Sequence, residues 1–202
     1  MPKQLDFYYN PRSRASIAHW MLEEVGADYR IHLIDFAKGD NRTSEFLAIN
    51  PMGKIPTLVV DGTVITEAPA IIAWLADAYP SAGLAPEVGS PERGNYYRWL
   101  FFGGSSFEPA FADKMFNRPL PDRPGALGWG TYDQVIDTLE KALNPGPYLL
   151  GDRFTAADLY VGAELGWATM FGAPRLKESK PISDFVARVS DRPAYKKAFK
   201  RD

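Results

Sequence analysis

Four residues near the start of the chain have side chains that could hydrogen-bond or charge-pair with a ligand: Tyr8, Asn10, Ser13 and Arg14. They follow an aromatic-rich segment, residues 3–9, which predicts a strand, and they precede an apolar repeat that predicts a helix. The carboxyl end of such a strand is where α/β sheets commonly place ligands. Two structural alternatives stay open, because Ser13 could serve only to cap the helix and Tyr8 only to pack on the sheet.

Glu67 is a second candidate, because it precedes a predicted helix. The first turn of that helix can offer the backbone N–H groups of Ala68 and Ala70 to an anion, whereas Pro69 has none to offer. A carboxylate beside N–H donors suits a ligand that carries both an ammonium and a carboxylate group. The alternative is an acidic residue that only stabilises the helix N-terminus.

The dipeptide Ile55-Pro56 lies just before a predicted strand. A peptide bond before proline adopts the cis form at a cost of only about 0.5–1 kcal/mol. A cis bond here would turn the backbone of Ile55 outward. An ordinary trans turn is the alternative.

The elements that position these residues alternate between strands and helices over residues 1–80. After the first strand, apolar residues recur at helical spacing, and residues 29–35 predict a second strand. Asp61-Gly62, between two β-branched runs, predicts a hairpin over residues 57–66, and another helix follows it. A right-handed crossover makes the first two strands parallel, while the hairpin adds antiparallel strands. The sequence therefore predicts an α/β domain with a mixed four-stranded sheet.

Beyond this domain the composition changes. Residues 80–90 are rich in proline and glycine, which predicts a linker. Residues 91–202 show helical spacing and no convincing strand, so they predict an all-helical domain. Thr155 and Asp158 have the spacing of a capping box, which indicates a helix start and a role in folding.

Composition excludes several classes of protein. With 202 residues, 46% hydrophobic and 24% charged, the chain can bury a core in one or two domains. Its 23 basic and 25 acidic residues give a net charge of -2, which does not indicate a nucleic-acid-binding surface. No apolar run reaches the roughly 18 residues of a membrane helix, and Asp6 interrupts any secretion signal. The absence of cysteine agrees with a cytoplasmic protein, and the two histidines have no metal-ligand pattern around them.

Four segments together resemble the cytosolic glutathione transferases: 8–14 (YYNPRSR), 50–62 (NPMGKIPTLVVDG), 66–71 (TEAPAI) and 151–158 (GDRFTAAD). They span nearly the whole chain in the order of that family's two domains. The resemblance implies a thioredoxin-like first domain, an all-α second domain, glutathione as cosubstrate and a homodimer.

The resemblance also implies which residues bind glutathione. The N–H and C=O groups of Ile55, beside Pro56, pair with the cysteinyl part, Lys54 meets the glycyl carboxylate, and Glu67 binds the γ-glutamyl end. Ala68 stands where the family usually has serine. Losing that hydrogen bond could cost roughly 1–3 kcal/mol, which predicts weak affinity for glutathione.

The residue that activates the thiol is left open among three. Family classes use tyrosine, serine or cysteine, and this chain has no cysteine. Tyr8 matches the catalytic place of the tyrosine-type classes and Arg14 that of their assisting arginine, so Tyr8 is the first candidate, followed by Ser13 and Asn10. Asn41 stands where some classes place another polar contact.

The predicted function is conjugation of glutathione to a small apolar electrophile, as in detoxification. Phe107, Phe111 and Met115 recur at helical spacing and could line the electrophile pocket, although such a stripe also forms a core. One alternative is a non-catalytic protein of the same fold that binds glutathione or hydrophobic ligands. Another is a structural domain that only dimerises. No metal, nucleic-acid or membrane partner is expected.

Overall fold

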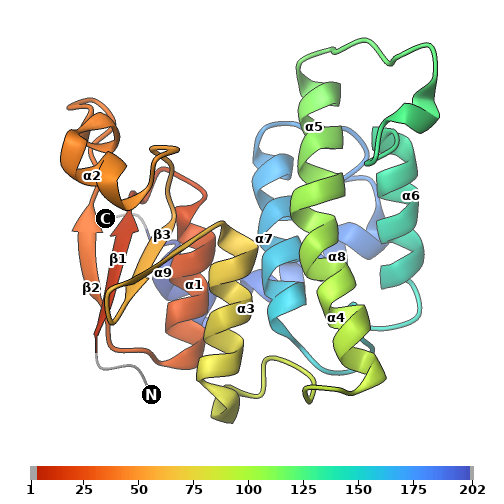
Figure 1. Ribbon diagram of the computed structural model, residues 1–202. Helices are drawn as coiled ribbons and strands as arrows, with labels where there is room; N and C mark the ends of the chain where they lie inside the picture. Colours follow the sequence, from red (N-terminus) through yellow and green to blue (C-terminus); the bar gives the residue numbers. More distant parts are fainter. Residues whose placement is uncertain (1–3, 201–202) are drawn as a thin grey trace. The chain divides into compact units, whose positions relative to one another are not determined.

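The computed structural model describes residues 4–200, and their contacts divide the chain into two compact units (Figure 1). The first unit contains residues 4–83 and 192–200, and the second contains residues 84–191. The C-terminal segment, which the sequence places with the helical half, therefore packs with the α/β half. The remaining residues of the expected domains, 1–3 and 201–202, lie outside the described part.

The sheet of the first unit has the strand order β2-β1-β3-β4. Strand β1 is parallel to β2 and antiparallel to β3, which is antiparallel to β4. This arrangement confirms the predicted mixed four-stranded sheet. The strands are β1 (Leu5–Tyr9), β2 (Arg30–Leu33), β3 (Thr57–Val60) and β4 (Thr63–Thr66).

The helices of the first unit follow the local signals in the sequence. Helix α1 buries Ile17 and Met21 completely or nearly so and ends at Gly26, which has the left-handed conformation that glycine favours. Helices α1 and α3 pack against each other, and α9 packs on α1. The helices and 3-10 turns are α1 (Ala15–Val25), η1 (Asp40–Arg42), α2 (Ser44–Ile49), α3 (Ala68–Ala78), η2 (Pro80–Ala82) and α9 (Pro193–Ala198).

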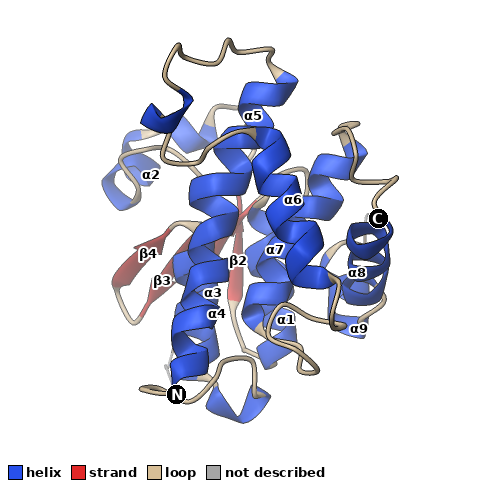
Figure 2. Ribbon diagram, turned by 90° about the vertical axis from the view of Figure 1, so that its right-hand side faces the viewer, coloured by secondary structure: helices blue, strands red, loops and turns tan. Residues whose placement is uncertain are grey.

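The second unit is built of helices, with one isolated β-bridge, Tyr148 to Gly151, among its described residues (Figure 2). A π-helical turn begins at Gly103, where a Cβ atom would lie 2.5 Å from the Tyr160 ring. Pro193 begins α9, which follows α8 after a short break. The elements are α4 (Pro91–Phe102), the π-turn η3 (Gly103–Phe107), α5 (Glu108–Met115), η4 (Pro124–Ala126), α6 (Tyr132–Leu143), α7 (Ala156–Met170) and α8 (Lys180–Ser190).

Helix α7 forms the centre of the second unit, and most of its side chains are buried. At its start, the Asp158 carboxylate accepts hydrogen bonds from the backbone N–H and the hydroxyl of Thr155, at 2.7 and 2.8 Å, and from the N–H of Leu149 at 2.7 Å. These bonds satisfy the N–H group of the residue that caps α7 and join the helix start to Leu149, which fits the folding role expected for this pair.

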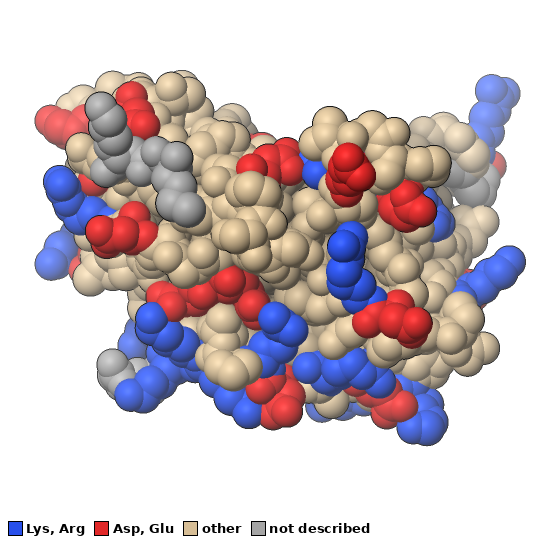
Figure 3. Space-filling view, turned by 90° about the horizontal axis from the view of Figure 1, so that it is seen from below, with Lys and Arg blue, Asp and Glu red and all other residues tan. Residues whose placement is uncertain are grey.

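The helices of the structure and the charges on one of its faces (Figure 3) were compared with those of membrane-spanning and nucleic-acid-binding proteins. Within residues 4–200, no helix is long and apolar enough to cross a membrane. Acidic and basic side chains lie side by side on the face shown in Figure 3. The described atoms of that face therefore form no broad patch of one charge, such as nucleic-acid-binding proteins carry.

Candidate functional site

The register of the sheet brings three separate segments to one edge. Thr57, the first residue of β3, is paired with Tyr8 near the end of β1 and with Thr66 at the end of β4. The turn after β1, the Ile55-Pro56 dipeptide before β3 and Glu67 after β4 therefore meet at the same end of the sheet, the upper end in Figure 1. The sequence-predicted ligand residues of the first unit are thus neighbours in space.

The turn after β1 is held by Asn10. Its side-chain amide donates to the carbonyl of Ile34 at 2.7 Å and its Oδ1 accepts from the N–H of Arg12 at 2.8 Å. The Ser13 hydroxyl donates to the carbonyl of Asn10 at 2.7 Å and accepts from the N–H of Ala15 at 3.2 Å. The side chains of Asn10 and Ser13 are therefore both engaged in the turn, and the half-buried Ser13 can donate to a ligand only by turning its hydroxyl away from the carbonyl of Asn10.

Tyr8, unlike Asn10 and Ser13, contacts its neighbours through an aromatic ring. Its ring stacks on His32 of β2, with centroids 4.7 Å apart, and lies 5.4 Å from the ring of Phe46 in α2. His32 shares a hydrogen bond of 2.7 Å with Asp6, which holds the pKa of that carboxyl below its usual value. Burial, and then the nearby Asp6 charge, raise the pKa of Tyr8, so its phenol is protonated at neutral pH. The ring is packed between β2 and α2.

Of the two forms that the sequence left open for the peptide bond between Ile55 and Pro56, the structure has the cis form. Within the described residues, no hydrogen bond engages the backbone N–H or C=O of Ile55. Its half-buried backbone can therefore accept an extended ligand in the manner of an added strand.

Glu67 has an unusual backbone conformation, with φ 66° and ψ 120°. A positive φ strains any residue other than glycine, and such strain is common at ligand sites. Its side chain is exposed, and the described residues supply no hydrogen bond or ion pair to its carboxylate. Ala68 begins α3, and Pro69 occupies its first turn, as expected. Glu67 thus presents a free carboxylate beside a helix N-terminus.

The turn that precedes Ile55 is held by two asparagines, Asn50 at its start and Asn41 in η1, and the sequence did not reveal this role. Asn41 donates to the carbonyl of Gly53 at 3.0 Å. Asn50, which is 4% exposed, donates to the carbonyl of Lys54 at 2.8 Å. Lys54 itself has an exposed side chain. The signal that the sequence offered was the place of Asn50 at the start of segment 50–62, which resembles the glutathione transferases.

The predicted electrophile stripe lies in the second unit. Phe107 and Phe111 are 1% and 6% exposed, and their rings stack with centroids 6.1 Å apart. Met115 is half-buried. Packing in the core accounts for the two phenylalanines, and a role for the three residues in an electrophile pocket stays a prediction.

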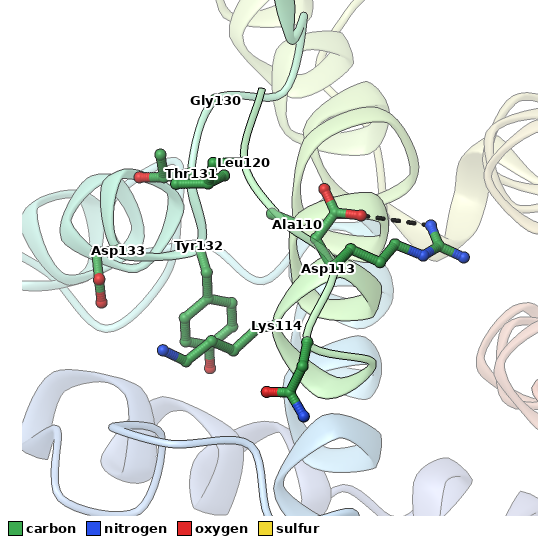
Figure 4. Close-up of a pocket in the computed structure, with 10 residues that line it drawn as sticks. Ala110, Asp113, Lys114, Leu120, Gly130, Thr131, Tyr132 and Asp133 are labelled. Atoms are coloured by element: carbon green, nitrogen blue, oxygen red, sulfur yellow. Dashed lines mark hydrogen bonds and ion pairs between the residues drawn. The ribbon is translucent and has the colours of Figure 1, made fainter. Parts of the chain in front are cut away.

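A pocket of about 330 Å³ in the second unit lies between α5 and the start of α6 (Figure 4). Asp113 in its wall pairs with Arg118 at 3.3 Å. The lining does not include the predicted stripe; it consists of Ala110, Asp113, Lys114, Asn117, Arg118, Leu120, Gly130, Thr131, Tyr132 and Asp133. Among the described residues, no group of three or more His, Asp or Glu side chains could hold a metal ion.

Two family models match the chain. The model of the glutathione S-transferase N-terminal domain matches residues 13–78, and that of the C-terminal domain matches residues 66–198. Together they extend over both compact units.

Relatives of known sequence and structure agree with these matches. The chain is 28% identical to glutathione S-transferase GstA of Escherichia coli O157:H7, over 94% of each chain, and 31% identical to glutathione S-transferase F10 of Arabidopsis thaliana, over 87% of this chain and 86% of the other. It is 31% identical to a Methylococcus capsulatus glutathione transferase structure, with a TM-score of 0.81, over 96% of this chain and 97% of the other. A sphingomonad glutathione S-transferase complexed with glutathione is also 31% identical, with a TM-score of 0.79, over 96% of each chain.

Proposed function

Because this chain belongs to the glutathione S-transferase family, we propose that it is an enzyme that binds glutathione at the edge of the sheet and transfers its thiolate to a small apolar electrophile. The observation that carries the proposal is the unpaired backbone of Ile55 beside the free carboxylate of Glu67. These are complementary to a peptide backbone and to an ammonium group, which glutathione offers together.

Glutathione is proposed to lie across this edge with its cysteinyl part paired to Ile55. The γ-glutamyl ammonium meets Glu67, and its carboxylate faces the N–H groups of Ala68 and Ala70 at the start of α3. The Lys54 ammonium, which is exposed, meets the glycyl carboxylate. Affinity is expected to be modest, because Ala68 offers no hydroxyl.

For thiol activation, the geometry favours Ser13 over Tyr8. The Ser13 hydroxyl lies in the turn between β1 and α1, at the edge where Ile55 and Glu67 meet, and next to the start of α1. The Tyr8 ring, by contrast, is packed between His32 and Phe46. We propose that the Ser13 hydroxyl turns away from the carbonyl of Asn10 when glutathione binds and donates its hydrogen bond to the sulfur instead, and that Arg14 and the N-terminus of α1 add positive potential.

The reaction follows from a stabilised thiolate. The S–H proton of glutathione leaves to solvent, and the sulfur uses its electron pair to form a C–S bond to the electrophilic carbon. With a halogenated aromatic electrophile, the halide departs with the electrons of its bond. A non-catalytic binding protein gains no support from the relatives, which are named as transferases.

A direct test combines binding with turnover. Calorimetry with glutathione should give a saturable one-site isotherm, and a dinitrohalobenzene should be converted to its glutathione conjugate at a rate that saturates with glutathione. Binding without turnover over several aromatic and alkyl electrophiles would support the non-catalytic alternative instead. No binding at millimolar glutathione would contradict the proposed function altogether.

We also propose that the protein is a cytoplasmic homodimer that acts in detoxification. The absence of cysteine supports the location, since reducing compartments do not favour disulfides. Tyr97 and Phe101, one turn apart on α4, are 38% and 66% exposed, and they support a second copy as the partner of this face.

A further inference from the structure

The turn that presents Ile55 is held by a buried asparagine, and we propose that Asn50 is a positioning residue for glutathione. The inference rests on the proposed function and names a residue that has no direct contact with the ligand. It follows from three features of the turn between α2 and β3.

The first feature is that both N–H groups and the oxygen of the Asn50 side chain have hydrogen-bond partners. Its Nδ2 donates to the carbonyl of Lys54 at 2.8 Å and to the hydroxyl of Thr57 at 3.1 Å, and its Oδ1 accepts from the N–H of Met52 at 3.1 Å. Asn50 is 4% exposed. A buried amide whose two N–H groups and oxygen all hydrogen-bond to one turn and the strand that follows it fixes the shape of that turn.

The second feature anchors the turn in the sheet. The Thr57 hydroxyl donates to the same carbonyl of Lys54 at 3.0 Å, and Thr57 is fully buried. Thr57 is the first residue of β3 and is paired with both Tyr8 and Thr66. Asn50 and Thr57 therefore hold the residue before Ile55 at a fixed place relative to the sheet.

The third feature is a hydrogen bond that holds the turn from η1. Asn41 donates to the carbonyl of Gly53 at 3.0 Å. Gly53 has φ 62°, and a Cβ atom there would lie 2.7 Å from the carbonyl oxygen of Asn41, so only glycine fits. The carbonyls of residues 53 and 54 are thus both held by the protein, while the backbone of Ile55 is unpaired.

The side-chain amides of Asn50 and Asn41 are therefore assigned a role in glutathione binding and not in the activation of its thiol. An extended ligand gains from a backbone partner that is already in place, because less conformational entropy is lost when the two pair. Loosening the turn should weaken binding of the peptide part of glutathione and leave the thiol-activating group unaffected. Asn41, on this view, acts on the turn and not directly on the ligand.

The test measures the dissociation constants of glutathione and of S-methylglutathione, which keeps the peptide but has no ionisable thiol, at a temperature well below unfolding. For Asn50→Ala and Asn50→Asp, we expect both constants to rise about tenfold or more. The pKa of bound glutathione and the turnover number at saturating glutathione should stay at their wild-type values. Asn144→Ala, which changes an exposed asparagine of the second unit, is the matched control.

A second pair of variants keeps the test decisive if Asn50 is needed for folding. Thr57→Val removes the hydroxyl that bridges Asn50 and Lys54, and Thr57→Ser retains it. We expect Thr57→Val to weaken S-methylglutathione binding and Thr57→Ser to restore it. Wild-type affinity in both the folded Asn50 variants and Thr57→Val would overturn the positioning role and leave the proposed function intact. Failure of the wild-type protein to bind either ligand would instead contradict the proposed function.

Discussion

At the scale of single residues, the distinction between Ser13 and Tyr8 decides how the thiol is activated. A thiol with pKa near about 8.5 is mostly protonated at neutral pH, so a shift of about two units, worth about 2.7 kcal/mol, makes the thiolate predominate. Ser13→Ala should therefore raise the pKa of bound glutathione by about one unit or more and slow conjugation about tenfold or more. Titration of thiolate absorbance measures the shift.

Tyr8→Phe is the matched variant, because it removes only a hydroxyl from a ring that stays packed between His32 and Phe46. We expect it to leave the bound thiol's pKa unchanged. The reverse result, a raised pKa in Tyr8→Phe and none in Ser13→Ala, would make Tyr8 the thiol donor, as the sequence motif alone suggests.

Glu67 has a strained backbone and is also proposed to bind the γ-glutamyl end of glutathione. Glu67→Gln keeps the side-chain shape and removes the charge, so glutathione affinity should fall about tenfold or more, a loss of about 1.4 kcal/mol. Glu67→Gly should also lose affinity, yet it should stabilise the fold by about 1 kcal/mol because glycine adopts φ 66° without strain. Calorimetry and denaturant unfolding measure the two effects. Unchanged affinity in both variants would remove Glu67 from the site.

At the scale of elements, the start of α7 should respond to pH. Burial raises the pKa of Asp158 from 3.8 to about 6. Because the folded state then holds this proton more tightly than the unfolded state, the resulting stability is full below about pH 4 and is lost as the pH rises through about 6. The unfolding free energy of the wild-type protein, relative to Asp158→Asn, should fall by about 2–3 kcal/mol between about pH 4 and pH 7. A difference that is constant with pH would contradict this expectation.

Helix α9 is tied to α1 by charge and by aromatic packing. Arg192 donates two hydrogen bonds to Glu24, at 2.6 and 2.8 Å, and Tyr195 packs edge-on against the buried Trp20. Because the Glu24 side chain is only 7% exposed, Arg192→Ala should lower the unfolding free energy by about 2–3 kcal/mol. Lys180→Ala breaks an exposed ion pair with Asp184 and should cost less than about 1 kcal/mol. Equal losses in the two variants would mean that the α9 pair stabilises the fold no more than an exposed ion pair does.

At the scale of the whole molecule, the chain passes between the two units twice, after Gly83 and after Asp191. The proposed dimer is also tested at this scale. Phe101→Ser should shift sedimentation toward the monomer at low protein concentration, because it places a polar group in the proposed contact. Val88→Ser, which changes another exposed apolar residue, should leave the dimer unaffected. A wild-type monomer at every concentration would contradict the dimer.

The sequence by itself determined the features that depend on a few neighbouring residues. The strands and helices of residues 5–78 and the hairpin at Asp61-Gly62 agree with the structure. The peptide bond before Pro56 is cis, one of the two forms that the local sequence left open. Turn residues and the periodicity of apolar side chains act over about one or two turns of chain, so they can be interpreted without the fold. The family motifs added the likeness to glutathione transferases.

Only the tertiary structure decided which side chains meet. It packed Tyr8 on His32, bound Asn50 to the turn before Ile55 and placed α9 in the first unit, where Arg192 pairs with a glutamate 168 residues earlier. It also buried Phe107 in the core of the second unit. Such contacts depend on register and on packing between distant segments, and no local pattern encodes them because the partners are neighbours only after the chain has folded.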